Sequence, residues 1–187
     1  KDTAIHTLVL WTKHPSSLLK RPLYDFLTHL KKQHIQLYIQ LTISGMGQQV
    51  FGKQTNDRNF IPEPSAPFYN DSLWQLAELI KLTENPLRIR LRIDPVIRIR
   101  DSKGDIYSNL PLFETILAKS SQEGIRDVSF SFLEAGVHKK VDTRFKNIGC
   151  EILSPNMAER EKFKTWAKDL EGKYQVRIHA CCVEGFA

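Results

Sequence analysis

Residues 87–100 read LRIRLRIDPVIRIR, and this stretch decides the fold that the sequence predicts. Apolar and charged side chains alternate through its first half, from Leu87 to Asp94. A period of two is typical of a β-strand, because successive side chains point to opposite faces of a sheet. Pro95 has no backbone N–H and is expected to end the strand. One face therefore carries several arginines and an aspartate, either as a solvated edge or as part of a binding site.

The composition is typical of a soluble globular protein. The length predicts one domain, spanning residues 1–187. The 187 residues are 41% hydrophobic and 26% charged, and no apolar run approaches the roughly 20 residues of a membrane span. A start at Lys1 rather than methionine suggests a piece of a longer protein. The net charge of +6 favours an anionic small molecule as partner, keeps nucleic acid possible and gives no sign of membrane binding.

Three cysteines are present, namely Cys150, Cys181 and Cys182. An odd count with one adjacent pair is not a disulfide framework, so we expect a reducing, cytoplasmic location. Adjacent residues of a strand point to opposite faces, which makes it difficult for Cys181 and Cys182 to bind one ion together with His179. No metal site is therefore predicted, and Cys150 is interpreted as a core residue.

Strands and helices are expected to alternate along the chain. The predicted strands span residues 5–12, 35–43, 87–94, 127–133 and 174–181. The predicted helices span about 18–33, 71–85, 110–122 and 156–171. This βαβαβαβαβ order predicts a parallel sheet with right-handed crossovers.

The side chains of the strands predict a partial TIM barrel rather than a doubly wound sheet. Strands buried on both faces form continuous apolar runs, whereas most strands here have one apolar and one polar face. We therefore expect helices on one face and a polar lumen on the other. The residues expected in this lumen are Gln40, Thr42, Arg90, Arg92, Asp94, Ser129, Ser131, Arg177 and His179.

Three motifs resemble a known family of uncharacterised bacterial and archaeal proteins. Residues 10–15 (LWTKHP) resemble its WTK-N-P motif, and residues 42–47 (TISGMG), followed by Glu63-Pro64, resemble its T-x-T/S-G-x-G…E-P segment. Residues 92–96 (RIDPV) resemble its R-x-D-P-[IV] strand end. The family is a domain-of-unknown-function group that looks related to radical S-adenosylmethionine (SAM) enzymes.

The resemblance implies a partial TIM barrel followed by a C-terminal cysteine cluster that holds a [4Fe–4S] centre. SAM and this cluster are therefore the cofactors implied for the full-length protein. The C-x-x-x-C-x-x-C pattern is absent from this sequence, so we expect this chain to hold neither stably. The cofactor-binding residues that the resemblance favours are Thr42, Gly45, Gly47, Glu63, Arg92 and Asp94.

Active sites of (βα) barrels gather at the C-terminal ends of the strands. On this basis the predicted substrate-binding residues are Thr12, Lys13, Gln40, Arg90 and His179. Arg92 and Asp94 could grip a carboxylate or phosphate through the guanidinium fork, or could form a structural ion pair. Gly45 and Gly47 could let the backbone approach a cofactor, or could form a plain turn.

The first functional hypothesis is the barrel portion of a radical-SAM-related enzyme that binds an anionic ligand or SAM. A nucleic-acid-binding module is a second hypothesis, and it needs a basic patch with exposed aromatic residues. A third is a conventional (βα)-barrel lyase or isomerase with Lys13 or His179 as the base. The sequence assigns no catalytic residue, substrate or oligomeric state.

Overall fold

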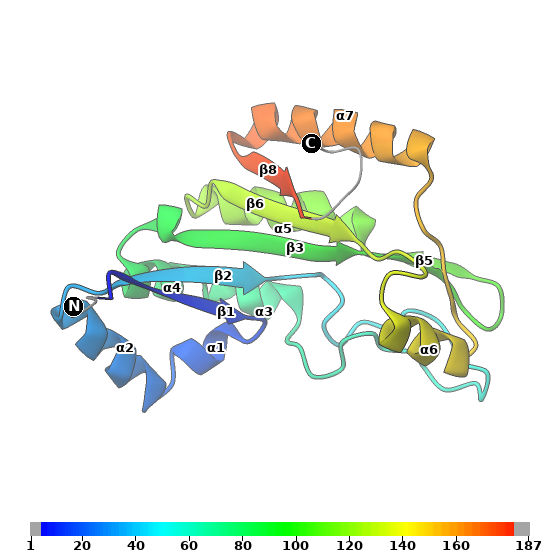
Figure 1. The fold of residues 1–187 in the computed structure, drawn as a ribbon, viewed down its shortest axis with the longest axis horizontal. Helices are drawn as coiled ribbons and strands as arrows, with labels where there is room; N and C mark the ends of the chain where they lie inside the picture. Colours follow the sequence, from blue (N-terminus) through cyan, green and yellow to red (C-terminus); the bar gives the residue numbers. More distant parts are fainter. Residues whose placement is uncertain (1–4, 182–187) are drawn as a thin grey trace.

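The computed structural model describes residues 5–181 and contains two β-sheets (Figure 1). The larger sheet has five parallel strands in the order β1-β2-β3-β6-β8. Their bounds are β1 Thr7–Thr12, β2 Gln36–Thr42, β3 Ile89–Val96, β6 Asp127–Phe132 and β8 Arg177–Ala180.

The expected partial TIM barrel with its lumen is wrong. The five-stranded sheet is open, because no strand among residues 5–181 pairs with the outer edges of β1 and β8. Five strands are fewer than the eight that close a barrel of this type. The polar face is therefore the face of an open sheet, on which Arg92 pairs with Asp94 and Arg177 with Asp127.

The smaller sheet also departs from the expectation of a wholly parallel fold. It is antiparallel, with strand order β5-β4-β7. Its strands are β4 Arg98–Arg100, β5 Ile106–Ser108 and β7 Glu151–Ile152. Figure 1 shows β5 and α6 beyond the ends to which the arrows of β3 and β6 point. Residues 97–100 do alternate, but strands of two or three residues are too short for the sequence to predict a separate sheet.

Most of the expected helices are confirmed, but the first is split at Pro22 and one further helix, α6, is present. Their bounds are α1 Pro15–Leu18, α2 Leu23–Lys32, α3 Tyr69–Trp74, α4 Leu76–Thr83, α5 Leu110–Gln122, α6 Lys139–Asn147 and α7 Met157–Tyr174, with a 3₁₀ turn η1 at Pro86–Arg88. Pro22 splits the first expected helix, since α2 begins immediately after it. Asn156 begins α7 through a capping box with Glu159. Helix α6 begins at Lys139 and has no counterpart among the helices that the sequence predicts.

The main core lies between the helices and the apolar face of the parallel sheet. Leu91 and Ile93 of β3 are 1% exposed, and they belong to one cluster with Phe113 of α5 and Phe163 of α7. The apolar half of the alternation in β3 therefore packs as expected. Strand β3 continues through Pro95 to Val96 with a shift of register against β6, so the predicted stop at Pro95 is wrong.

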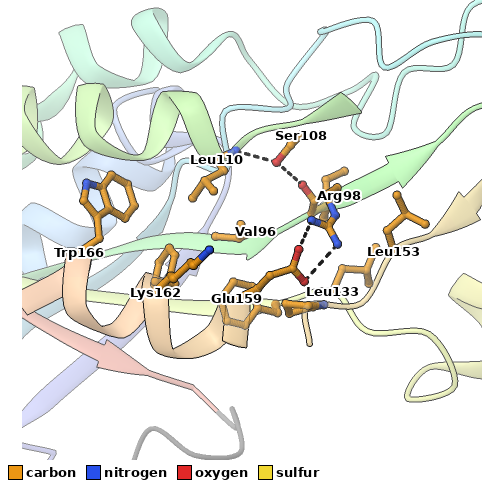
Figure 2. Close-up of a pocket in the computed structure, with 13 residues that line it drawn as sticks. Val96, Arg98, Ser108, Leu110, Leu133, Leu153, Glu159, Lys162 and Trp166 are labelled. Carbon is orange, nitrogen blue, oxygen red and sulfur yellow. Dashed lines mark hydrogen bonds and ion pairs between the residues drawn. The ribbon is translucent and has the colours of Figure 1, made fainter. Parts of the chain in front are cut away.

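A second core lies under the antiparallel sheet. Phe51 and Phe60 of the long loop after β2 pack there with Ile99 of β4 and Phe145 of α6. The two sheets meet beside a hollow of about 330 Å³, which is shown in Figure 2. No helix within residues 5–181 has the length and apolar character to cross a membrane.

Candidate functional site

The polar face of the parallel sheet brings together residues that lie far apart in the sequence. The strand register puts two rows side by side. The first row is Trp11, Gln40, Arg90, Asp127 and Arg177, and the second is Thr42, Arg92, Ser129 and His179. Most residues expected on the polar face therefore do share one surface.

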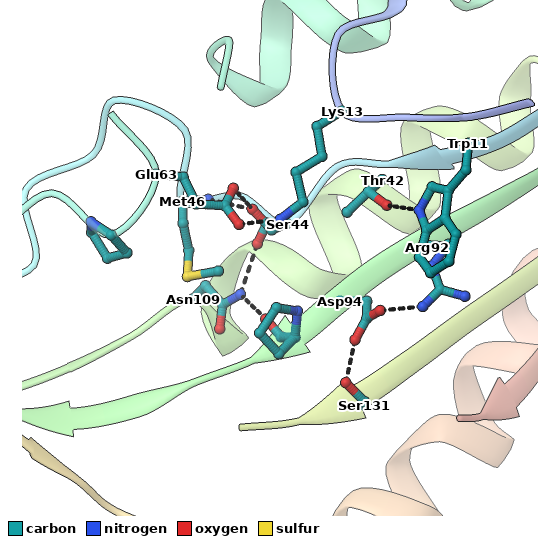
Figure 3. Close-up of polar contacts among 12 residues, drawn as sticks. Trp11, Lys13, Thr42, Ser44, Met46, Glu63, Arg92, Asp94, Asn109 and Ser131 are labelled. Atoms are coloured by element: carbon teal, nitrogen blue, oxygen red, sulfur yellow. Dashed lines mark hydrogen bonds and ion pairs between the residues drawn. The ribbon is translucent and has the colours of Figure 1, made fainter. Parts of the chain in front are cut away.

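Arg92 lies at the centre of this surface and is 8% exposed. One of its terminal nitrogens pairs with Asp94 (Figure 3). The other lies 3.5 Å from the Gln40 side-chain oxygen. The Trp11 ring lies over the guanidinium, with 4.4 Å between Cζ and the ring centroid. The Trp11 indole N–H donates to Thr42 Oγ1 at 3.2 Å, which holds the ring in this position.

Asp94 is held on both sides. One carboxylate oxygen accepts from Arg92 and the other from the Ser131 hydroxyl. A carboxylate whose two oxygens are both engaged fixes the positions of its partners. We therefore assign Asp94 the role of orienting Arg92.

Three buried polar atoms on this face have no hydrogen-bond partner among residues 5–181. They are Nε of Arg90, Nε of Arg92 and Oγ of Ser129. Arg92 and Ser129 lie opposite each other in the register of β3 and β6. Buried donors without acceptors are costly and uncommon in proteins. The two arginine N–H groups therefore mark a place where an acceptor is missing.

A second polar group lies where β1 and β2 end. Glu63 pairs with Lys13 through one oxygen, and its other oxygen accepts from Ser44 Oγ at 2.6 Å. Ser44 Oγ in turn accepts the Met46 backbone N–H at 3.2 Å. The hollow beside these residues measures only about 10 Å³, which is room for about one water molecule. This group ties the long loop to the sheet.

The two glycines after β2 pack against the protein itself. A Cβ on Gly47 would lie 1.9 Å from the Pro67 carbonyl oxygen, and one on Gly45 would lie 3.1 Å from Leu112 Cδ1. Gly45 also has a φ of +79°, which favours glycine. These contacts support the plain-turn interpretation, while contact with a cofactor stays a prediction.

Two predicted residues lie apart from Arg92. Thr12 is paired in register with Leu41 on the apolar side, and its hydroxyl accepts the His14 backbone N–H at 2.8 Å. His179 lies near the outer edge of the sheet, 3.4 Å from Asp127 Oδ1, and shares that carboxylate with Arg177 at 2.9 Å. The surface around Arg92 therefore excludes Thr12, and His179 lies at its outer end, beyond Ser129 and beside Asp127.

The cysteines belong to different parts of the fold. Cys150 is buried in the second core, and burial raises the pKa of its thiol, so it stays protonated and unreactive. Cys181 follows β8, and Cys182 lies outside the described residues. Within residues 5–181, no three histidine, cysteine or carboxylate side chains gather as metal ligands would.

Sequence reasoning missed three residues of this region. Trp11 lies in the strand expected over residues 5–12, where exposed and half-buried side chains alternate, and its ring is 66% exposed. Asp127 is expected only as the first residue of a strand. Asn109 gives no local signal, because its partners are distant in the sequence. Its side-chain amide donates to the carbonyls of Ser44 and Pro95 at 2.7 and 2.9 Å.

Comparison with known families places the chain. Residues 1–186 match the family described as "Domain of unknown function (DUF1848)". The chain belongs to this family. The resemblance to a family of domains of unknown function is thereby confirmed. No curated protein and no solved structure matches the chain.

Proposed function

We propose that this DUF1848 domain binds an anionic small molecule on the polar face of its parallel sheet, through Arg92 and Arg90. The observation that carries the proposal is the pair of buried arginine Nε–H donors without an acceptor among residues 5–181. A carboxylate or phosphate supplies acceptors in the geometry of the guanidinium fork. Charge-assisted hydrogen bonds of this kind contribute about 1.5–3 kcal/mol each.

Trp11 controls access to Arg92 in this proposal. The indole covers the guanidinium, so an anion reaches Nε after the ring swings outward. The ring is held by one hydrogen bond to Thr42 and one cation–π contact, worth about 0.5–1.5 and 0.5–2 kcal/mol respectively. Two charge-assisted bonds to an anion offset that cost. Because Trp11 is 66% exposed, its movement loses little buried area.

The described residues do not fit an iron–sulfur cluster. Such a centre needs several cysteine thiolates that converge on one site, whereas Cys150 lies in the second core and Cys181 follows β8. A relation to radical SAM enzymes stays a hypothesis. The carboxylate of SAM is one anion of the class proposed here.

Titration with phosphate, citrate and succinate tests the proposal by calorimetry and by thermal unfolding. At least one of these anions should bind and raise the melting temperature, because a ligand that binds only the folded state stabilises it. Arg92→Met should weaken binding at least about tenfold, the equivalent of one lost charge-assisted bond.

Arg100→Met is the matched control. Arg100 forms an exposed ion pair with Glu151 in the other sheet and faces no part of the proposed site. It should bind the anion as the unaltered chain does. An equal loss of anion affinity in both variants would mean that net charge alone explains binding. Undiminished binding by Arg92→Met would refute the proposal.

A further inference from the structure

A second hollow lies on the opposite, helix-covered side of the parallel sheet, at its junction with the antiparallel sheet (Figure 2). Its volume of about 330 Å³ is at the lower end of the range for small-molecule sites. Strand ends, the start of α5 and the first half of α7 surround it. It shares no residue with the surface around Arg92.

The walls are mainly apolar and well supported. Phe132, Phe163 and Trp166 line one side, and their rings pack on one another with centroids 5.1 and 5.5 Å apart. Leu110 lines the hollow from the start of α5 and remains 37% exposed. Packed aromatic walls offer a preformed surface to the body of an apolar ligand.

The carboxylate of Glu159, at the rim, already has hydrogen-bond partners. Glu159 accepts from Arg98 at 2.6 and 3.3 Å and from the Asn156 backbone N–H at 2.9 Å. The Arg98 and Asn156 hydrogen bonds hold the pKa of Glu159 below its usual range, so this side chain stays ionised and paired. The opposite charges of Arg98 and Glu159 therefore neutralise each other.

Lys162 is the uncompensated charge of the hollow. It lies one helical turn after Glu159 in α7, is exposed, and forms no direct hydrogen bond or ion pair within residues 5–181. Its charge also helps to lower the pKa of Glu159, although Arg98 is the direct partner of that carboxylate. Figure 2 shows its ammonium among the lining side chains. The rim thus holds two cations against one anion, with the spare cation beside an apolar wall.

We propose that this hollow binds a small monocarboxylate with an apolar body, its carboxylate on Lys162 and its body against Trp166 and Leu110. A neutral ligand would leave the ammonium without a counter-charge. A cationic ligand would be repelled by it. The site is independent of the anion-binding surface around Arg92.

Octanoate, octanol and octylamine separate charge from apolar contact, because they share a chain and differ in headgroup. Calorimetry on the whole chain should give octanoate the highest affinity, about two- to fivefold above octanol, as an ion pair with an exposed lysine implies. Octylamine should bind most weakly. Equal affinity for octanoate and octanol, or no binding of octanoate, would overturn the proposal.

Variants locate the binding. Lys162→Met should bring octanoate down to the affinity of octanol, whereas Lys168→Met, an exposed lysine of the same helix, should change nothing. Leu110→Trp fills the hollow from a partly exposed position and should abolish binding of both ligands. Octanoate binding unchanged in Lys162→Met or in Leu110→Trp would contradict the assignment.

The indole N–H signal of Trp166, assigned with Trp166→Phe, gives a direct readout. Octanoate should shift this signal and leave that of Trp11 in place. Arg92→Met should keep its affinity for octanoate, which distinguishes failure here from failure of the anion site. A shift confined to Trp11 would place the ligand on the other face and refute the proposal.

Discussion

The two faces of the parallel sheet are built from alternate residues of the same strands, yet they are held in different ways. On one face Leu91 and Ile93 are buried against helices. On the other, Arg92 and Asp94 are held by an ion pair, a serine hydroxyl and an exposed tryptophan. Apolar burial stabilises the first face, whereas two arginine Nε–H donors of the second have no acceptor among residues 5–181. Stability and binding should therefore respond to different substitutions.

The largest loss of stability is expected from the apolar face. Phe113 is fully buried, and its ring packs on Phe130, Phe163 and Trp166 with centroids 5.4–6.2 Å apart. Phe113→Ala should lower the free energy of unfolding by about 3–5 kcal/mol, from lost burial and the cavity left behind. Urea denaturation followed by circular dichroism measures this. A loss below about 1 kcal/mol would show that the helix-covered face does not hold the fold.

A smaller loss is expected from the loop that supports the polar face. In Gly47→Ala the new Cβ would meet the Pro67 carbonyl at 1.9 Å, so the loop must shift at a cost of about 1–3 kcal/mol. Gly172→Ala is the control, because a Cβ there meets nothing within 4 Å. That substitution, inside α7, should stabilise the protein by about 0.5–1 kcal/mol. Equal effects of the two substitutions in denaturation would contradict the close packing at Gly47.

Arg92→Met should cost less stability than Phe113→Ala, about 1–3 kcal/mol, because Asp94 keeps its bond to Ser131 but loses its counter-charge. Removing the carboxylate as well, in the double variant with Asp94→Ala, should recover part of this loss. A double-mutant cycle in urea gives the coupling between the two side chains. Strict additivity would mean that the ion pair contributes nothing to the fold.

The smallest change in stability near neutral pH is expected from Asp101, whose carboxylate holds a turn beside the antiparallel sheet. Burial favours its neutral form, but backbone N–H groups of Lys53, Lys103, Asp105 and Gly104 outweigh this and lower the pKa of Asp101. A lowered folded pKa adds stability above the unfolded value of about 3.9, and this stability is lost as pH falls through the folded pKa.

Asp101→Asn tests this assignment by its pH dependence. The variant should be less stable than the unaltered chain above about pH 4, and the difference should narrow as the medium becomes more acidic. Unfolding curves at several acidic pH values measure it. A difference that does not change with pH would remove the ionised carboxylate from the explanation.

Local periodicity predicted the elements that face the main core. The alternation corresponds to β3 from Ile89 onward, while Leu87 and Arg88 lie in η1, and the helix expected over 110–122 has the bounds of α5. The short strands of the antiparallel sheet carry too few residues for a period to be read. β7 has only two, Glu151 and Ile152.

The barrel was wrong for a different reason. One-sided polarity was interpreted as a closed lumen, yet pairing of Arg92 with Asp94 and of Arg177 with Asp127 accounts for the same residues on an open face. A polar side of a strand can face a barrel lumen or the open face of a sheet. Which of the two it faces depends on the number of strands and on whether the sheet closes, and both are long-range properties. The contacts of Asn109 are equally long-range, since its partners lie up to 65 residues away.

The most direct test of the central claim is the side-chain N–H spectrum of the arginines during titration with phosphate or citrate. The Nε–H signals of Arg92 and Arg90 should shift with the indole signal of Trp11, because these donors have no partner within residues 5–181 and Trp11 covers the first. Arg160 is the internal control, since it is equally buried and its Nε–H already donates to the Pro155 carbonyl. Shifts at Arg92 and Trp11 with Arg160 unchanged are the predicted result. Uniform shifts of all arginines, or none at Arg92 at saturating anion, would contradict an anion site on this face.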